Sequence, residues 1–325
     1  MHSIIVSPDL EKLKALIREE KAFTVMDSEV RRLWGGLLPE PDFTIESGEE
    51  QKSLATAGRL IERLLEKKAG RDAFLVGIGG GVVCDITGFA ASIYKRGIRS
   101  GFVPTTLLSQ VDAAIGGKNG VDVAGVKNAA GTITMPDWVF ICRDFLRTLP
   151  QREYLSGAAE MLKSFIIADR ELYLRAAAFF RKHSCAVSLS DSAAAEELGF
   201  LAGEAARIKC AIVERDPYEK GGRRLLNLGH TYGHAIEMSG CGLSHGEAVA
   251  AGIILASRLS RQRAGLPADE AEMLESDFAA IGLPTESPVP VENLNQLILN
   301  DKKRDSQGLH FIAIERIGKV SEIII

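Results

Sequence analysis

The stretch Ala73-Phe74-Leu75-Val76-Gly77-Ile78-Gly79-Gly80-Gly81 joins a short apolar run to a cluster of glycines. A continuous apolar run of this length is typical of a strand buried on both faces of a parallel sheet. Residues Val82–Tyr94 follow with helical periodicity, so the segment predicts a strand, a glycine-rich turn and a helix. Such a turn can be purely structural, or it can let the backbone approach a pyrophosphate at the helix N-terminus. The spacing up to Asp85 is not the ordinary GxGxxG fingerprint, so both interpretations stay open here.

The segments around this turn repeat the alternation of strands and helices up to Leu149-Pro150. Helices are expected at 9–20 and 53–68, and strands at Ala22–Met26, Phe43–Ile45, Ser100–Val103 and Trp138–Ile141. After Pro150 the pattern is helical at 151–167, 170–182, 191–213, 230–239, 244–262 and 268–280, with a terminal hairpin at Leu309–Ile314 and Val320–Ile325. We therefore expect a Rossmann-like α/β domain with a parallel sheet over residues 1–149 and a mainly helical domain over 150–325.

The bulk composition is that of a soluble globular protein. The 325 residues are 46% hydrophobic and 25% charged, and the net charge is −4, whereas nucleic-acid-binding modules usually carry a basic excess. Five scattered cysteines without a CxxC pair indicate a reducing compartment and no disulfide framework. The sequence shows neither a signal peptide nor an apolar run long enough to span a membrane, so we expect a cytoplasmic protein.

Three of the six histidines fall within sixteen positions, at His230, His234 and His245. The first two are four residues apart and share one face of a helix, and neutral imidazole is the commonest metal ligand. Glu160, three residues before Lys163, has apolar neighbours in the sequence, so its carboxylate is either in a surface ion pair or buried with a partner. One Glu and two His form a standard catalytic zinc set, although helix-surface or core histidines are the alternative.

Several polar side chains fit an anionic ligand. Thr105 and Thr106 follow a predicted strand and supply two hydroxyls at an expected helix start. We interpret the segment after them as a loop that forms a phosphate-binding wall, with Asp112, Lys118, Lys127 and Asn128 among glycines. Further basic candidates are Lys209, Arg223, Lys302 and Lys303, each of which taken alone also fits a solvated surface charge.

Taken together, these motifs resemble the 3-dehydroquinate synthase family over nearly the whole chain. The matching stretches are Gly48-Glu49-x-x-Lys52, Gly79-Gly80-Gly81-Val82-Val83-Cys84-Asp85, Arg96-Gly97, Val103-Pro104-Thr105-Thr106-Leu107-Leu108, Asp112-x-x-x-Gly116-Gly117-Lys118, Lys127-Asn128, Leu149-Pro150, Ala159-Glu160-x-x-Lys163, Asn227-x-Gly229-His230-x-x-Gly233-His234-Ala235-Ile236-Glu237, His245-Gly246-Glu247 and Asp301-Lys302-Lys303. No single motif is decisive, but their common order leaves little room for chance.

The resemblance implies an NAD-binding α/β domain, a helical metal-binding domain and an active site between them. It implies that Glu160, His230 and His245 hold Zn²⁺, and the same ligands also suit Co²⁺. The implied NAD contacts are Glu49, Lys52, Gly79, Gly80, Gly81, Asp85, Thr105, Thr106, Asp112, Lys118, Lys127 and the turn from Phe145 to Thr148. The implied catalytic, substrate and phosphate contacts are Arg96, Asp112, Lys118, Asn128, Lys163, Lys209, Arg223, Asn227, His234 and the Lys302-Lys303 region.

The implied reaction converts 3-deoxy-arabino-heptulosonate 7-phosphate to 3-dehydroquinate and phosphate. It proceeds through transient oxidation by NAD, β-elimination of phosphate, reduction, ring opening and aldol closure, with the metal polarising the C5 hydroxyl. His234 is expected to move a proton near the metal. The resemblance also implies a homodimer. Two departures are Val126, where many members have glycine, and a chain somewhat short for the family, for which we expect trimmed loops or a trimmed N-terminus.

Three other functions compete with this interpretation. Another sugar-phosphate cyclase, forming a valiolone or an inosose, would share the metal and NAD motifs. Its substrate-side residues would differ from the set Arg96, Asp112, Lys118, Lys127-Asn128 and Arg223, which matches the dehydroquinate-forming pattern. A metal-dependent polyol dehydrogenase would consume NAD stoichiometrically and release no phosphate. A non-catalytic NAD-binding module would not need the histidines, Glu160 and Lys163 together.

Overall fold

The computed structural model describes residues 3–185, 191–300, 304–305 and 308–324. The chain divides into two compact units. Unit 1 comprises Met1–Leu149 and Leu198–Cys210, and unit 2 comprises Pro150–Glu197 and Ala211–Ile325. Among the described helices, none is long and apolar enough to cross a membrane.

Unit 1 is built on a six-stranded sheet in which every neighbouring pair is parallel. Its strands are β1 (Ser3–Val6), β2 (Phe23–Asp27), β3 (Phe43–Ile45), β4 (Phe74–Gly79), β5 (Arg99–Pro104) and β8 (Trp138–Ile141), in the order β1-β8-β5-β4-β2-β3. Its helices are α1 (Leu10–Glu19), α2 (Ser28–Trp34), α3 (Leu54–Glu66) and α4 (Gly81–Ile93). The predicted fold class, a parallel sheet with helices followed by a mostly helical part, is confirmed.

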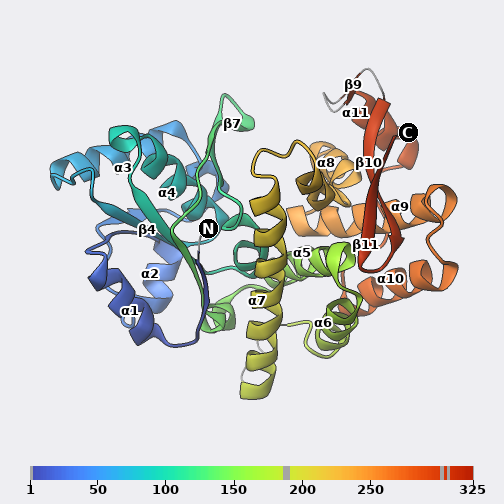
Figure 1. The fold of residues 1–325 in the computed structure, drawn as a ribbon, viewed down its shortest axis with the longest axis horizontal. Coiled ribbons are helices and arrows are strands. Elements are labelled where there is room, and N and C mark those ends of the chain that lie inside the picture. The colour runs from blue at the N-terminus through green and yellow to red at the C-terminus, as the bar shows by residue number, and fades with distance from the viewer. Residues whose placement is uncertain (1–2, 186–190, 301–303, 306–307, 325) are drawn as a thin grey trace. The chain divides into compact units, whose positions relative to one another are not determined.

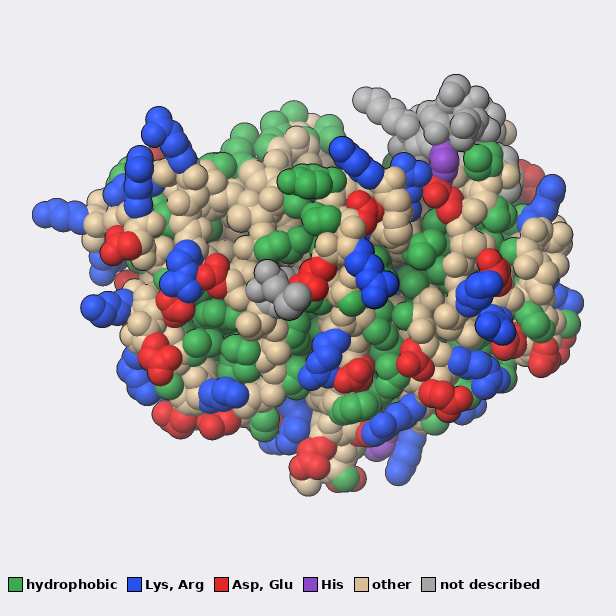
Figure 2. Space-filling model, in the orientation of Figure 1, with side chains coloured by type: hydrophobic (Ala, Val, Ile, Leu, Met, Phe, Trp, Pro, Cys, Tyr) green, Lys and Arg blue, Asp and Glu red, His purple; other side chains and the backbone are tan. Residues whose placement is uncertain are grey.

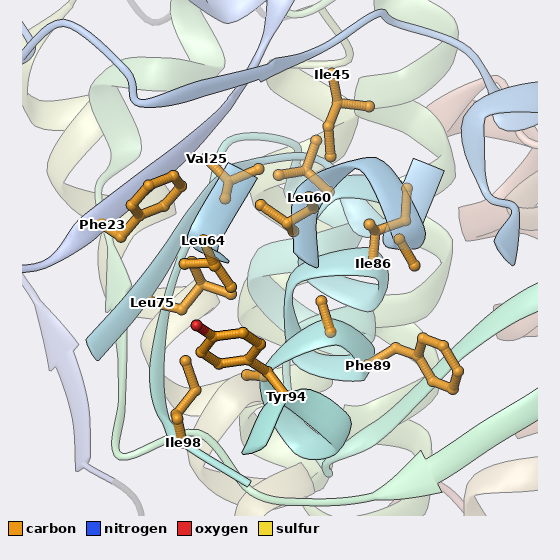
Figure 3. Close-up of a cluster of buried hydrophobic side chains, with 14 of the residues drawn as sticks. Phe23, Val25, Ile45, Leu60, Leu64, Leu75, Ile86, Phe89, Tyr94 and Ile98 are labelled. Carbon is orange, nitrogen blue, oxygen red and sulfur yellow. The ribbon is translucent and has the colours of Figure 1, made fainter. Parts of the chain in front are cut away.

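Strand β4 is apolar along its whole length because both faces of the sheet are covered. Leu75 faces a cluster formed with α3 and α4, whereas Phe74, Val76 and Ile78 face a second cluster with α1. The alternation follows from the two-residue period of a strand. Figure 3 shows the first cluster, in which Leu75 lies among side chains of β2, α3 and α4. In Figure 1 these two helices lie on one side of β4, and α1 and α2 lie on the other.

The order of the strands creates a switch point between β2 and β4. The chain leaves β2 outward to β3, whereas it leaves β4 in the opposite direction, to β5. Doubly wound sheets bind their ligands in the crevice at the carboxyl ends of such strands. Those ends carry Asp27 on β2 and Gly79 on β4. The topology therefore directs attention to the glycine-rich turn.

The prediction of a loop between Asp112 and Asn128 is wrong at its start, where Asp112 and Ala113 end a helical turn, and over its second half. Strands β6 (Lys118–Val123) and β7 (Val126–Ile133) form an antiparallel hairpin. Val121 is buried in the cluster with α3 and α4, and Gly120 and Gly131 let the paired backbones approach closely. The glycines and charged residues concealed this strand pattern, since only one face of the hairpin is apolar.

Unit 2 contains most of the predicted helices close to their expected ends: α5 (Gln151–Ala168), α6 (Arg170–Lys182), α8 (His230–Met238), α9 (His245–Arg263) and α10 (Ala268–Ile281). Helix α11 (Val291–Asn300) was not predicted. The strands of unit 2 are β9 (Arg304–Asp305), β10 (Gly308–Arg316) and β11 (Lys319–Ile324). The predicted terminal hairpin is confirmed by the antiparallel pairing of β10 with β11. The long helix α7 (Ser192–Arg215) contributes Leu198–Cys210 to unit 1 and its ends to unit 2, which the sequence pattern did not indicate.

The surface carries charges of both signs. On the face that Figure 2 draws, lysine and arginine side chains are interspersed with aspartate and glutamate. This distribution agrees with the small net charge of −4.

Close backbone packing holds α8 and α9 together in unit 2. A Cβ on Gly252 of α9 would lie far inside van der Waals contact with the carbonyl oxygen of Gly229 and 2.9 Å from the nitrogen of Gly233. A Cβ on Gly246 would collide in the same way with the backbone of Ser156 on α5. These glycines bring the first residues of α8 and α9 close to α5, since no side chain separates the helices.

We predict opposite effects for two glycine-to-alanine changes in helices. Gly252→Ala forces the α8 and α9 backbones apart and lowers the free energy of unfolding by about 1–3 kcal/mol. Gly58→Ala in α3 is the matched control, because an added Cβ there meets no atom of the described residues within 4 Å and alanine favours the helix. Thermal unfolding should show a midpoint several degrees lower for the first variant and no decrease for the second. An unchanged midpoint for Gly252→Ala would contradict the packing described here.

Candidate functional site

The glycine-rich turn presents an open helix N-terminus at the carboxyl end of β4. Helix α4 begins at Gly81, and its N-cap Gly80 supplies no side-chain hydrogen bond. The first N–H groups of a helix lack intrahelical partners and attract anions. Gly79 cannot be replaced without cost, because a Cβ there would lie 2.7 Å from the Val83 side chain and 3.2 Å from Asp27. The turn can therefore receive a phosphate group close to the backbone.

Ionisable residues surround this turn. Lys52 Nζ lies 2.5 Å from Asp85 Oδ2. Burial raises the pKa of the Asp85 carboxyl to about 6, although Lys52 opposes the shift. Glu49 and Lys209 also act on this carboxyl electrostatically, the first raising and the second lowering its pKa. Four of the residues expected near NAD or substrate are thus within electrostatic reach of one another in unit 1.

The neighbouring segments supply further expected residues. Thr105 follows β5 directly, and its backbone N–H donates to the Gly79 carbonyl at 2.9 Å. Thr106 Oγ1 lies 2.8 Å from Ser109 Oγ, at the start of the next helical turn. Lys209 on α7 donates to Asp112, at 2.6 Å to Oδ1 and 2.8 Å to the carbonyl oxygen.

Other expected residues lie on neighbouring turns of unit 1 and on the β6–β7 hairpin, where the Asp122 N–H donates to the Lys52 carbonyl at 2.8 Å. Lys118, Lys127 and Asn128 are exposed on the β6–β7 hairpin, and Arg96 is exposed at the end of a 3₁₀ turn. The Phe145 side chain is buried against Trp34, with ring centroids 5.1 Å apart, so only its backbone can face a ligand.

Thr148 accepts a hydrogen bond from the indole Nε1 of Trp34, at 3.1 Å. Lys302 and Lys303 lie outside the described residues.

In unit 2, three helices bring together Glu160, His230 and His245. Glu160 lies in the middle of α5, His230 is the first residue of α8, and His245 is the first residue of α9. One ligand atom from each residue lies within 4.8 Å of the other two. Glu160 Oε1 is 3.7 Å from His230 Nε2 and 3.4 Å from His245 Nε2.

These distances suit a tetrahedral metal ion. Zinc binds histidine and carboxylate donors at roughly 2.0–2.2 Å, which places two donors of a tetrahedron roughly 3.4 Å apart. The Glu160 side chain is fully buried, and among the described residues no backbone or hydroxyl group donates a hydrogen bond to its oxygens. The ammonium group of Lys163 is in ion-pair contact with Oε2, which leaves Oε1 for another cation. A buried carboxylate that lacks neutral donors needs such charged partners.

Both histidine rings are held through their other nitrogen. His230 Nδ1 lies 3.2 Å from the carbonyl oxygen of Leu228, and His245 Nδ1 lies 3.3 Å from Glu237 Oε2. A histidine that donates from Nδ1 keeps Nε2, the atom nearer Glu160 in both residues, for a metal ion. Contacts of this kind orient metal-ligating histidines and make them better donors. Glu237 appeared in the sequence motif, but no spacing rule connected it to His245.

Burial and neighbouring charges shift the pKa values of all three residues. Burial opposes ionisation of Glu160, but Lys163 and the two imidazoles hold its pKa well below the usual range. Burial and the charge of Lys163 hold the pKa of His230 well below its usual value, so this ring is a neutral ligand. Burial also opposes the charge on His245, but Glu160 and Glu237 outweigh it and raise its pKa to about 10.

His234 lies beside these residues without belonging to them. Its ring centroid is 5.2 Å from that of His230 and 6.4 Å from that of His245. Among the described residues, the group of donors that could hold a metal consists of Glu160, His230 and His245. The helical spacing alone had left a His230–His234 ligand pair open.

The remaining expected residues of unit 2 lie near the start of α8. Arg223 and Asn227 belong to the 3₁₀ turn Gly222–Asn227, which ends three residues before His230. Arg223 is buried and donates to the Pro217 carbonyl at 2.6 Å, and Asn227 Nδ2 donates to Glu219 at 2.6 Å. Lys163 is buried one helical turn from Glu160. Two basic side chains and one amide therefore lie within a few residues of a candidate metal ligand in the chain.

Comparison with known proteins agrees with this arrangement. Two family models match consecutive parts of the chain: the 3-dehydroquinate synthase N-terminal domain at residues 42–156 and the C-terminal domain at residues 157–304. A 3-dehydroquinate synthase of Pyrococcus abyssi is 36% identical over 337 residues, covering 99% of this chain and 95% of the relative.

Solved structures of related enzymes have the same fold. A 2-epi-5-epi-valiolone synthase from Streptomyces hygroscopicus, solved with NAD⁺ and Zn²⁺ bound, superposes with a TM-score of 0.88 at 27% identity, covering 99% of this chain and 92% of that one. A 2-deoxy-scyllo-inosose synthase complexed with carbaglucose-6-phosphate, NAD⁺ and Co²⁺ gives 0.77 at 25% identity, covering 98% and 90%. By its matching family models and its near-full-length relatives, the chain belongs to the 3-dehydroquinate synthase family.

Proposed function

We propose that this protein converts 3-deoxy-arabino-heptulosonate 7-phosphate to 3-dehydroquinate and phosphate, with NAD and a divalent metal ion. The family membership supports the reaction. The single structural observation that carries the proposal is the convergence of Glu160 Oε1 with the Nε2 atoms of His230 and His245. Two carbocycle-forming structural relatives were solved with NAD⁺ and either Zn²⁺ or Co²⁺.

The metal would be held by Glu160, His230 and His245, and NAD by the glycine-rich turn of unit 1. When bound, the metal polarises a substrate hydroxyl and NAD accepts and later returns a hydride. Glu237 and the Leu228 carbonyl orient the two imidazoles through their Nδ1 atoms. Lys163 keeps the Glu160 carboxylate ionised, as a ligand must be.

The basic residues around His230 would bind the anionic groups of the substrate. Arg223 is buried and its planar guanidinium can bind phosphate or carboxylate through two parallel hydrogen bonds. Lys163 and Asn227 add donors on neighbouring turns. His234 is the group we assign to proton transfer, because it adjoins the metal ligands without being one of them.

Lys52, Asp85, Thr105 and Thr106 would line the NAD site together with Gly79–Gly81. The switch point of the sheet and the open N-terminus of α4 support this assignment. Asp112 and Lys209 pair with each other beside this turn, and Glu49 acts on Asp85. Lys118, Lys127, Asn128 and Arg96 are proposed as contacts on the strength of the family motifs.

A second candidate is a sugar-phosphate cyclase that forms a valiolone. The high TM-score of 0.88 with a valiolone synthase favours it, since that fold and cofactor set suit both reactions. Sequence favours the dehydroquinate-forming reaction, because the Pyrococcus relative is 36% identical and the valiolone synthase 27%.

We also propose that the protein acts as a homodimer in the cytoplasm, as the family resemblance implies. Light scattering after size-exclusion chromatography should give twice the chain mass of 35.1 kDa. A mass of one chain at micromolar concentration would contradict the dimer.

Incubation with the heptulosonate phosphate, NAD and Zn²⁺ should release phosphate and dehydroquinate in equal amounts. NAD should show no net reduction, because it is regenerated in each turnover. Chelation of the metal should stop both products, and added Zn²⁺ should restore them. If this substrate released no phosphate while another sugar phosphate was cyclised, the assignment would be overturned.

Substitutions at Glu160 and His234 separate metal binding from proton transfer. Glu160→Ala should abolish metal retention, because it removes the carboxylate ligand. His234→Ala should retain the metal and lose about 10²- to 10⁴-fold in rate, the range for a general acid or base. Elemental analysis after dialysis measures the first effect, and steady-state rates measure the second. Metal loss in both variants would show that His234 is a ligand.

A further inference from the structure

One face of α5 meets the N-terminus of α9 in three successive contacts. The residues are Arg152, Ser156 and Glu160, which are four apart and so share a face of the helix. They contact, in turn, Glu247, Gly246 and His245, the first three residues of α9 in reverse order. Successive turns of α5 therefore contact successive residues of α9. The third contact, between Glu160 and His245, lies in the candidate metal site.

The first contact is a bidentate ion pair. Arg152 Nε donates to Glu247 Oε1 at 3.1 Å and to Oε2 at 3.0 Å, and its Nη2 donates to Oε2 at 2.6 Å. The same Nη2 donates to the carbonyl oxygen of Gly242 at 2.5 Å. Arg152 thus fixes both the first turn of α9 and the loop that leads into it.

Glu247 in turn holds Ser244, the residue before His245. Its carboxylate accepts the backbone N–H of Ser244 at 2.7 Å, and the Ser244 hydroxyl accepts the N–H of Glu247 at 3.4 Å. This capping box fixes the backbone on both sides of His245.

The second contact sets the distance between the helices. The backbone N–H of Gly246 donates to Ser156 Oγ at 3.1 Å in a buried position, and a Cβ at Gly246 would collide with the Ser156 backbone. The register and the spacing of α9 on α5 are therefore both determined before the third contact is reached.

We propose that Arg152 is a positioning residue for the metal ligand His245. Its ion pair with Glu247 holds the first turn of α9 in the register that places His245 Nε2 opposite Glu160 Oε1. Arg152 itself contacts neither of these two residues by any hydrogen bond or ion pair described. This inference rests on the metal site proposed above. The ion pair is largely solvent-accessible on the Arg152 side, so its loss should not prevent folding.

The test compares Arg152→Leu with Arg175→Leu. Arg175 makes an equally bidentate and half-exposed ion pair in unit 2, with Glu197, at 2.5 and 2.6 Å. It is therefore a matched control for the loss of one ion pair. Binding of Co²⁺ to the metal-stripped full chain is followed by visible absorption, and thermal midpoints are recorded for every variant.

Arg152→Leu should raise the Kd for Co²⁺ about tenfold, in the lower part of the range for residues that orient metal ligands. Its Co²⁺ spectrum should also weaken, because a displaced His245 leaves a more hydrated ion. Arg152→Lys should fall between the wild type and Arg152→Leu, because lysine keeps the charge without the paired geometry. Arg175→Leu should match the wild type in Kd and spectrum.

Equal Kd values and spectra for the wild type and Arg152→Leu would overturn the positioning role, as would equal losses in Arg152→Leu and Arg175→Leu. Glu160→Ala distinguishes this failure from failure of the metal site. If Glu160→Ala bound Co²⁺ as tightly as the wild type, the metal site itself, and with it the role of Arg152, would be wrong. If only Glu160→Ala lost the metal, the site would stand and the inference about Arg152 would fall.

Discussion

The burial of the Glu160 carboxylate imposes the main constraint on the helical unit. A carboxylate removed from water is costly unless charge or hydrogen bonds compensate for it, and in the described part of the chain no backbone or hydroxyl group donates to the two oxygens of Glu160. Lys163 on the same helix supplies one compensating charge, and two imidazoles from α8 and α9 complete the surroundings. The glycines of α8 and α9 are needed because those rings reach Glu160 only when the helix backbones are in close contact.

In the sheet unit, the candidate ligand site is formed by backbone groups rather than by side chains. Strand β4 is wholly apolar because both of its faces are covered. The polar groups that can meet a ligand therefore lie in the turn that follows the strand. Gly79 closes that turn against Val83 and Asp27, which leaves the N–H groups of α4 available to an anion. In both units, glycine allows the close approach on which the chemistry depends.

Periodicity predicted the parallel sheet and most helices, because buried faces repeat every two or 3.6 residues. It failed at the β6–β7 hairpin, whose glycines and charges resemble a loop, and it did not indicate that the middle of α7 belongs with the sheet. Family motifs indicated Glu160, His230 and His245 as ligands, which spacing alone could not separate from His234. The roles of Glu237 and Arg152 could not be predicted, because they depend on how α8 and α5 meet α9.

X-ray absorption at the zinc edge of the metal-loaded protein tests the central claim, that Glu160, His230 and His245 hold the ion. We predict nitrogen and oxygen ligands at roughly 2.0–2.2 Å, with the outer scattering of two imidazole rings. Scattering from three imidazoles would place His234 among the ligands. Either that result or a sulfur ligand at roughly 2.3 Å would contradict the account.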